Sequence, residues 1–336
     1  MRPVARVGRW AWVLVGLATA AALAVTGTRL IVSAGVRQAP ARTFTRHPPR
    51  QMVARILTRT VTVRQPVSSL NVQAYAPGLI EVKTAPVAHV QITETIIWSA
   101  SPPAVVQSVS GGRLSLADPA CANDSCSVSF VVKVPPGVTV TAAGGPLFIS
   151  GTSGADLDSD GAPVSVTDIR GPLNVSTHGG PLQINGLTGP LLANTGGGQV
   201  VASHVTAASA VVTTSHGPVQ LAFSAAPTSV TVSTSGGLAE LSVPGGPYAL
   251  TTNSDGAAQT IGIATSSAAH RSITITTGGG PLIIGSGKIP GNGLGEPGSF
   301  FGPLQSGRGA QARRTQRAVT TPFGGPSVFY GSQPIG

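Results

Sequence analysis

The stretch that decides the fold is GPLNVSTHGGPLQINGLTGPLLANTGGG, residues 171–198. Its Gly-Pro pairs at 171–172, 180–181 and 189–190 fall nine residues apart, and Gly198 continues the spacing. Proline has no backbone N–H and suits the first position of a strand, whereas glycine suits a tight corner. Nine residues therefore hold one short strand and one turn, and two such units make a coil that returns to stack on the previous coil.

The same arrangement recurs over residues 141–285 with a full period near nineteen residues. In GGPLQI we expect Leu182 and Ile184 to point inward and Gln183 outward, because side chains alternate along a strand. We expect a glycine at each corner because a sharp corner needs a positive φ. The expected corner glycines are Gly145, Gly161, Gly180, Gly198, Gly217, Gly237, Gly256 and Gly280.

Alignment of the repeats on these glycines predicts which side chains face the interior and which face solvent. The further inward pairs are Leu147/Ile149, Val164/Val166, Val200/Ala202, Val219/Leu221, Ala239/Leu241, Ala258/Thr260 and Leu282/Ile284. The further outward residues are Phe148, Ser165, Val201, Gln220, Glu240, Gln259 and Ile283. Stacked coils should lie about 4.8 Å apart and pair each other's backbones, so that only the two ends are free edges.

Residues 59–140 carry a succession of short strand signals, such as TVTVRQ and HVQITETIIW, several of them separated by turn pairs such as Gly111-Gly112. Aromatic residues make up only 4% of the 336 residues, while glycine (44) and proline (28) are abundant, which suits short strands and tight turns. The predicted fold class is all-β: a β-solenoid of about eight glycine-marked rungs over 141–285, preceded by a hairpin-rich β region over 59–140.

The N-terminal residues indicate export and anchoring. Three arginines precede the uncharged run WAWVLVGLATAAALAVTGT, residues 10–28, which as a helix would be about 28 Å long, close to the thickness of the hydrocarbon layer. We expect a cytoplasmic N-terminus over 1–9, a transmembrane anchor over 10–28, and a single-pass cell-membrane protein with its C-terminal bulk outside the cytoplasm. The alternative is a cleaved signal peptide, because Ala22-Leu23-Ala24 forms a small-x-small cleavage site.

The net charge of +10 is concentrated in the segments that flank the predicted strands. Residues 29–58 are rich in Arg and Pro and are expected to form a linker; residues 286–336 are rich in Gly, Pro and Arg and are expected to form a disordered tail. The strand region lacks the basic residues interleaved with aromatic residues that nucleic-acid binding requires, so no nucleic-acid partner is expected. The tail contains aromatic residues that could cap the solenoid or bind a partner: Phe300, Phe301, Phe323, Phe329 and Tyr330.

The two cysteines lie close together in a turn-rich stretch. Cys121 and Cys126 occur in DPACANDSCSVSF, and an exported loop of this size is expected to be closed by a disulfide bond. Two free thiols are the alternative, and a metal site is the least favoured because two ligands are too few for zinc.

Two parts of the chain carry a family resemblance. The segment CSVSFVVKVPPGVTVTAAGGPLFISG, residues 126–151, leads into rungs such as THGGPLQI and TSHGPVQL of the T-x-x-G-G-x-L-x-I type. In these residues the chain resembles the bacterial putative-adhesin domain family, a repetitive β family of envelope proteins, from about residue 59 to residue 285. The resemblance implies a β-solenoid on the cell envelope and implies no catalytic residues. The basic, Pro-rich linker and the long tail depart from the family's commoner form.

One acidic cluster has the opening of a calcium-binding loop. Asp156, Asp158 and Asp160 precede Gly161 in GADLDSDGAP, but the position where a helical calcium loop needs a bidentate Glu is Thr167. The favoured interpretation is that these aspartates are outward residues of an ordinary rung, with calcium binding as the weaker alternative.

Catalytic constellations are sparse. His178 and His216 occupy matching positions before a corner glycine but two rungs, about 9.6 Å, apart, which is too far for a shared metal without His204 or another ligand, so solvent-facing corners are favoured. A polysaccharide-acting enzyme would need acidic and basic groups on one outer face. The solenoid offers for this only a few charged side chains: Asp168, Arg170, Glu240, Asp255 and Arg271.

The sequence therefore predicts a membrane-anchored extracytoplasmic β-solenoid with a structural, adhesive or envelope-interaction role, without catalysis and without a cofactor. Its expected partners are the membrane, through residues 10–28, and a cell-wall polymer or envelope protein. The main alternative is a cell-wall or polysaccharide-binding module with the same fold and one specific face; a polysaccharide-acting enzyme is less favoured.

Overall fold

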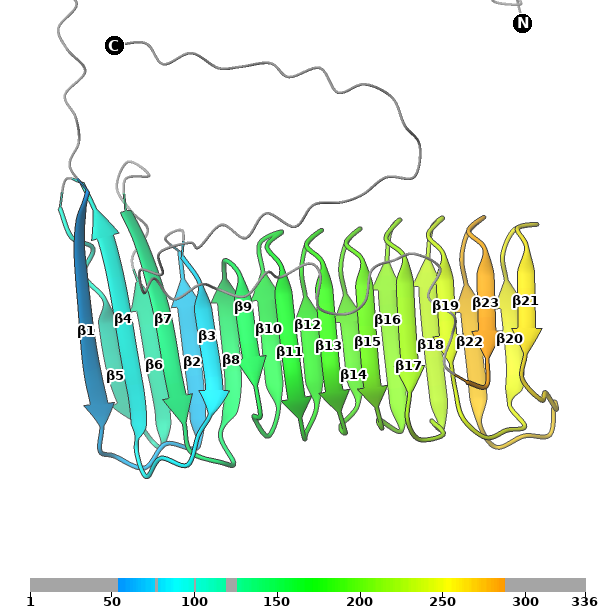
Figure 1. Cartoon of the computed structure of the whole chain (residues 1–336), viewed down its shortest axis with the longest axis horizontal. Helices are drawn as coiled ribbons and strands as arrows, with labels where there is room; N and C mark the ends of the chain where they lie inside the picture. Colours follow the sequence, from blue (N-terminus) through cyan, green and yellow to red (C-terminus); the bar gives the residue numbers. More distant parts are fainter. Residues whose placement is uncertain (1–53, 76–77, 100, 119–125, 288–336) are drawn as a thin grey trace, which may run out of the picture. The chain divides into compact units, whose positions relative to one another are not determined.

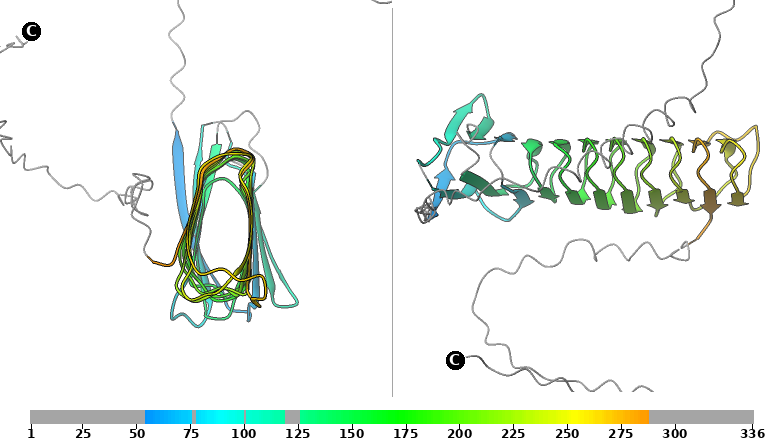
Figure 2. Two further views of the ribbon diagram at one scale, coloured as in Figure 1. Left: turned by 90° about the vertical axis from the view of Figure 1, so that its right-hand side faces the viewer. Right: turned by 90° about the horizontal axis from the view of Figure 1, so that it is seen from above.

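The computed structural model describes residues 54–75, 78–99, 101–118 and 126–287, which form two sheets that face each other (Figures 1 and 2). The described residues contain no helix, and so none that is long and apolar enough to cross a membrane; the predicted anchor at 10–28 lies outside them.

One sheet has 12 strands, in the order β1 (Arg55–Val63), β4 (Val90–Trp98), β7 (Cys126–Val134), β3 (Ile80–Thr84), β9 (Leu147–Ser150), β11 (Val164–Ile169), β13 (Leu182–Leu187), β15 (Val200–Val205), β17 (Val219–Phe223), β19 (Ala239–Ser242), β23 (Leu282–Gly285) and β21 (Gln259–Gly262). The other has 11 strands, in the order β20 (Ala249–Asn253), β22 (Ser272–Thr276), β18 (Ser229–Thr234), β16 (Ser209–Thr214), β14 (Leu191–Asn194), β12 (Leu173–Ser176), β10 (Ala155–Ser159), β8 (Thr139–Gly144), β2 (Ser69–Ala74), β6 (Arg113–Asp118) and β5 (Val106–Ser110).

Each coil of the chain adds one strand to each sheet, as the nine-residue spacing predicts. From β8 to β19 the strands alternate between the sheets, and each pairs in parallel with the equivalent strand of the next coil, 15 residues away at the first step (Val140 with Ala155) and 20 at the last (Val219 with Ala239). Seen along the stack, these coils superpose as one flattened loop (Figure 2). The all-β class and the stacked coils are therefore confirmed as a solenoid-like fold with two parallel-rich sheets.

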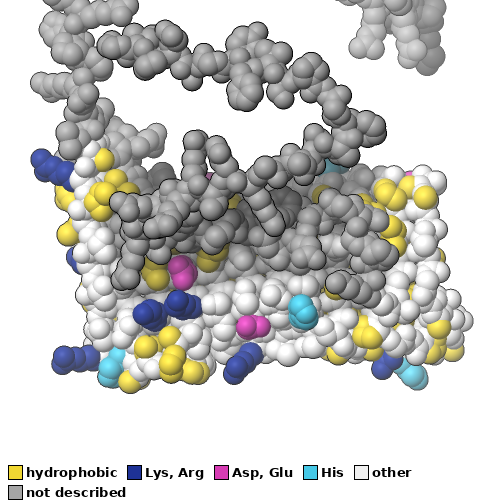
Figure 3. Space-filling view, viewed as in Figure 1, with side chains coloured by type: hydrophobic (Ala, Val, Ile, Leu, Met, Phe, Trp, Pro, Cys, Tyr) yellow, Lys and Arg dark blue, Asp and Glu magenta, His cyan; other side chains and the backbone are white. Residues whose placement is uncertain are grey.

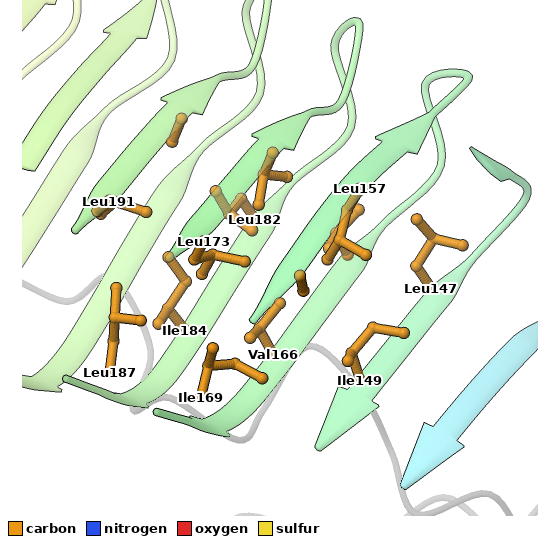
Figure 4. Packing of buried hydrophobic residues seen from close by; sticks show 14 of the residues in the cluster. Leu147, Ile149, Leu157, Val166, Ile169, Leu173, Leu182, Ile184, Leu187 and Leu191 are labelled. Atoms are coloured by element: carbon orange, nitrogen blue, oxygen red, sulfur yellow. The ribbon is translucent and has the colours of Figure 1, made fainter. Parts of the chain in front are cut away.

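Small aliphatic side chains fill the space between the sheets. Leu182 and Ile184 are buried, and the in-register pairs on neighbouring strands point into the same space (Figure 4). The predicted inward pairs from Leu147/Ile149 to Ala239/Leu241, and Leu282/Ile284, are buried as expected. The alternation of apolar and polar residues explains this burial, because every second side chain of a strand lies on the same face of the sheet.

One predicted inward pair is wrong. Ala258 and Thr260 are exposed, and the residues of β21 that pair with Leu282 and Ile284 are Gln259 and Ile261. Aligning this repeat on Gly256 places it one residue out of register. Gly256 has a left-handed backbone and lies one position before the corner, not at it. Gln259, predicted to face outward, instead faces the lumen at the end of the stack.

The C-terminal coils do not stack in chain order. β22 and β23 insert between the coil of β18–β19 and the coil of β20–β21, so the last coil in sequence is the second to last in space. The step of 24 residues from Gly256 to Gly280, longer than the others, contains the connection that this return requires. β20 and β21 are therefore the terminal strands of their sheets.

At the other end, the region 59–140 belongs to the same two sheets. β2 and β3 form a coil that pairs in parallel with β8 and β9, so the stack begins before residue 141. The predicted hairpin character is limited to the antiparallel set β1–β4–β7 and to the pair β5–β6. These antiparallel strands close one end of the stack.

The corner glycines are needed for a different reason from the one expected. Of the predicted set, only Gly161 (φ 75°) and Gly256 (φ 88°) have a positive φ. At the other six positions a Cβ atom would collide with the backbone of the neighbouring coil: at Gly198 it would lie 2.0 Å from the carbonyl oxygen of Gly180. This column is occupied by Gly145, Gly180, Gly198, Gly217, Gly237 and Gly280, with Ala162 and, in the terminal coil, Ala257 as exceptions.

A ladder of buried hydroxyl groups holds these corners. Thr195 Oγ1 donates to the carbonyl oxygen of Gly198 at 2.7 Å, and the equivalent bonds recur at Thr177, Thr234 and Thr277. These hydroxyl groups are buried where the chain turns between the sheets, so they satisfy carbonyl groups that no strand partner reaches. The T-x-x-G spacing in the repeats is the sequence signal for this ladder.

Candidate interaction surface

The three aspartates of the predicted calcium loop lie on the solvent side of one rung. Asp156 and Asp158 are alternate exposed residues of β10, and Asp160 follows the strand. Asp156 accepts a hydrogen bond from Asn174 at 3.0 Å, and Asp158 lies 3.1 Å from His178 Nδ1. Their carboxylates therefore point to separate partners, and the described ranges contain no group of three His, Cys, Asp or Glu residues arranged to hold a metal ion.

The histidines are not in matching positions. The register of β12, β14 and β16 aligns His178 with Ser215, so His216 is one residue away from the equivalent corner position. His178 and His204 both have left-handed backbones, with φ values of 50° and 54°. His204 Nδ1 lies 2.9 Å from the side-chain oxygen of Asn185, which gives it a partner on the neighbouring coil rather than a place in a metal site.

Cys126 carries a disulfide bond. It begins β7, next to the antiparallel end of the stack. Cys121 lies outside the described residues, so its pairing with Cys126 stays a prediction, as does every expectation for the tail aromatics.

The charged residues considered for an enzyme are dispersed. Asp168 and Arg170 are exposed at the end of β11, whereas Asp255 and Arg271 lie several coils away near β20. On the uncovered part of the face in Figure 3, the few charged side chains include both acidic and basic ones, and large areas carry none. These four charged residues therefore do not form one acidic and basic group on a single outer face.

Glu240 differs from the other outward residues because it is buried. Its Oε2 accepts a hydrogen bond from Gln220 Nε2 at 3.1 Å, while Oε1 has no hydrogen-bond partner among the described residues. Burial raises the pKa of this carboxyl group above its ordinary value of 4.5, and the hydrogen bond from Gln220 partly opposes the shift. The sequence pattern does not predict this burial, because Glu240 falls among the residues expected to face solvent.

The raised pKa of Glu240 leads to a pH-dependent prediction. A carboxyl group whose pKa is higher in the folded state contributes stability below its unfolded pKa, and this contribution is lost as the pH rises through the folded pKa. Glu240→Gln removes the charge, so its melting temperature should exceed that of the wild type at pH 7, and the difference should shrink at pH 4. Thermal unfolding of both proteins at the two pH values measures this; an equal difference at both would contradict it.

Four neighbouring strands of the 11-stranded sheet present a face rich in hydroxyl groups, here called the hydroxyl face. It consists of the outward residues of β16, β18, β22 and β20, which the strand register places side by side. None of its members is charged: Ser209, Val211, Thr213, Ser229, Thr231, Ser233, Ser272, Thr274, Thr276, Ala249, Thr251 and Asn253. The hydroxyl groups repeat at the strand spacing of about 4.8 Å along the stack.

A cavity of about 600 Å³ opens where the hydroxyl face reaches the terminal strand β20. Its aliphatic lining comes from Ala249, Leu250 and Ile261. Its polar lining comes from five residues that carry a hydroxyl group: Thr251, Thr252, Thr265, Ser266 and Ser267. No charged side chain lines it. Aligning the repeats in the sequence does not reveal this cavity, because the cavity forms only where β20 is the last strand of its sheet.

Tyr248 positions the loop that forms one wall of the cavity. Its backbone N–H donates to Ala264 at 3.1 Å, and its carbonyl oxygen accepts from Ser266 N–H at 2.9 Å, so the residue between these two, Thr265, is held in place. The Tyr248 ring is fully buried, and its hydroxyl donates to the Pro244 carbonyl oxygen at 2.6 Å. The wall is therefore tied to the core rather than free at the end of the stack.

The interior of the terminal coil is closed by polar side chains. Thr252 Oγ1 donates to Gln259 Oε1 at 2.9 Å, and Gln259 Nε2 donates to Ser254 Oγ at 2.8 Å. Terminal repeats of solenoids need such a polar outer surface, because no further coil covers them. Thr251, Thr265 and Ser267 also line the cavity, and their side chains have no hydrogen-bonded partner among the described residues.

Comparison with solved structures gives bacterial proteins of low sequence identity to this chain. No family model and no curated protein matches the sequence. A putative adhesin from Parabacteroides merdae is 12% identical, with a TM-score of 0.36, over 68% of this chain and 95% of that chain. A putative adhesin from Bacteroides fragilis is 13% identical, with a TM-score of 0.36, over 68% and 97%. A putative cell adhesion protein from Clostridium sporogenes is 11% identical, with a TM-score of 0.22, over 69% and 100%.

Proposed function

We propose that the chain is a membrane-anchored extracytoplasmic solenoid with a structural or adhesive role at the cell envelope. The observation that carries this proposal is the regular stack of coils, whose outer faces repeat polar residues over its length while acidic and basic groups stay dispersed. Such a stack offers an extended binding surface. The resemblance of the rungs to the putative-adhesin family supports the same role.

The anchoring part of the proposal rests on residues 10–28, an uncharged run long enough to span the membrane. In this arrangement residues 1–9 are cytoplasmic, and the linker over 29–58 separates the membrane from the stack. A binding partner in the envelope, either a wall polymer or another surface protein, then lies within reach of the outer faces.

The anchor can be tested by expressing the full chain in bacteria and washing the membranes with alkaline carbonate. We expect the wild-type chain to stay in the membrane fraction and its strand region to be digested by protease added to spheroplasts. Leu14→Arg with Leu17→Arg should release most of the protein, because each arginine costs about 2.5–3.5 kcal/mol at the centre of a spanning helix. An N-terminus beginning near residue 25 would instead establish a cleaved signal peptide.

The binding part can be tested by sedimenting the purified full chain with isolated cell walls, in calcium and in chelator. Saturable binding in both buffers is expected, because Asp156 and Asp158 point to separate partners. Binding lost in chelator would restore the calcium interpretation, and absence of binding in both would overturn wall attachment in favour of a protein partner.

A further inference from the structure

We propose that the cavity at the end of the stack is a carbohydrate-binding site that takes one or two units of a neutral glycan, with the hydroxyl face supporting the chain beyond it. This inference rests on the proposed envelope role and names the class of ligand and its site. The cavity volume of about 600 Å³ falls within the range of pockets that bind small ligands.

The lining of the cavity matches the chemistry of a sugar. Five of the lining residues carry hydroxyl groups, and those of Thr251, Thr265 and Ser267, which have no hydrogen-bonded side-chain partner among the described residues, can both donate and accept, as the hydroxyl groups of a sugar require. Leu250 and Ile261 provide an aliphatic surface for the C–H face of the ring, and Ile261 is 44% exposed although it is a large hydrophobic residue. A purely polar or purely apolar ligand would leave one half of this lining unmatched.

The absence of charge selects against ionic ligands. The lining contains no Lys, Arg, Asp or Glu, and the twelve outward positions of the hydroxyl face contain none either. The one described basic side chain nearby is that of Arg271, whose carbonyl oxygen accepts from Ala249 N–H but whose side chain is not part of the lining, so an anionic polymer would lose its hydration for little opposite charge. A neutral glycan loses only hydrogen bonds to water, which the hydroxyl groups of the protein can replace.

The lining is also held in place before a ligand binds. The loop carrying Thr265 and Ser266 is fixed by the backbone hydrogen bonds of Tyr248, and Thr252 is fixed by Gln259. Thr251, Thr265 and Ser267 keep their hydroxyl groups available. Because Thr251 belongs to both the cavity and the hydroxyl face, a glycan leaving the cavity would continue over Thr274 and Thr231, its in-register neighbours.

The test measures binding of the full chain, in detergent, to neutral mannan, arabinogalactan and dextran, to short oligosaccharides from each, and to anionic polygalacturonate. We expect at least one neutral polymer and its oligosaccharide to bind, and the anionic polymer not to bind. A triple variant, Thr251→Val with Thr265→Val and Ser267→Ala, should bind both neutral probes at least about tenfold more weakly, because it removes three hydrogen-bonding groups.

Matched variants distinguish a loss of binding at the cavity from a loss of fold and from a loss of contacts on the hydroxyl face. Thr265→Trp should fill the cavity and abolish oligosaccharide binding, while Ser224→Trp, in an exposed loop between β17 and β18, should leave it unchanged. Thr231→Val with Thr274→Val should weaken binding of the polymer about threefold and leave the oligosaccharide unaffected.

Three outcomes would overturn the inference: binding of the oligosaccharide unaffected by the triple variant, binding of the anionic polymer only, or no probe bound. If the wild-type chain still sediments with cell walls in any of these cases, the proposed envelope role stands and the error lies in the site or its ligand. Failure of the wild-type chain itself to sediment with cell walls would instead overturn wall attachment, whatever the outcome with the soluble probes.

Discussion

Gly198→Ala is expected to lower the free energy of unfolding by about 3 kcal/mol or more. The added Cβ would lie 2.0 Å from the carbonyl oxygen of Gly180 and 2.8 Å from that of Gly179, distances at which backbone atoms must move apart. Both carbonyl groups belong to the neighbouring coil, so relief requires the coils to separate at a corner where Thr195 donates its hydroxyl hydrogen bond. Urea unfolding followed by circular dichroism at a β-sheet wavelength measures the loss.

Two other glycines serve as controls for this prediction. Gly285→Ala should be nearly neutral, because its Cβ meets no atom within 4 Å and its φ is not positive. Gly161→Ala meets open space but has a φ of 75°, so it should cost about 1 kcal/mol from backbone strain alone. If Gly161→Ala were the more destabilising of the two corner variants, positive φ rather than close approach would be the main requirement at the corners.

Arg59→Ala is expected to destabilise the antiparallel end of the stack by about 2–3 kcal/mol. Glu94 is fully buried on the inward face of β4, between Ile92 and Ile96, and its carboxylate is paired with the guanidinium of Arg59 on β1. Removing the arginine leaves a buried carboxylate without its counter-charge, which costs about 3–5 kcal/mol in a fully buried pair. Arg59 is 47% exposed, so solvent reduces the expected effect.

Replacing both partners provides the control. Arg59→Met with Glu94→Met removes the charges together and fills the interior with apolar atoms, so the double variant should be close to the wild type in stability or above it. Glu94 Oε1 has no hydrogen-bond partner among the described residues, which favours the apolar replacement further. A double variant as unstable as Arg59→Ala would show that the loss comes from packing of the arginine side chain rather than from an unpaired charge.

The pair of Glu94 and Arg59 also shows how far sequence patterns reach. HVQITETIIW alternates so regularly that Glu94 falls in the inward set, between Ile92 and Ile96. The alternation could not identify Arg59 as its partner. Arg59 and Glu94 are 35 positions apart and meet only because β1 pairs with β4, and either strand could form backbone hydrogen bonds with other strands equally well. Glu240 is the converse case, an outward residue that only the folded environment buries.

The sequence by itself determined the all-β class, the coil of about nineteen residues and the alternation that buries Leu182, Ile184 and their equivalents. These properties are local: a strand has a two-residue period, and a chain that turns every nine residues must stack its coils. Tertiary structure alone decided the order of the last two coils, the close approach that reserves Gly198 for glycine, and the cavity beside Thr251 and Thr265. The physical reason is that the repeats are alike, so many neighbours satisfy the same local pattern. Only the backbone ladder and contacts between distant coils select one arrangement.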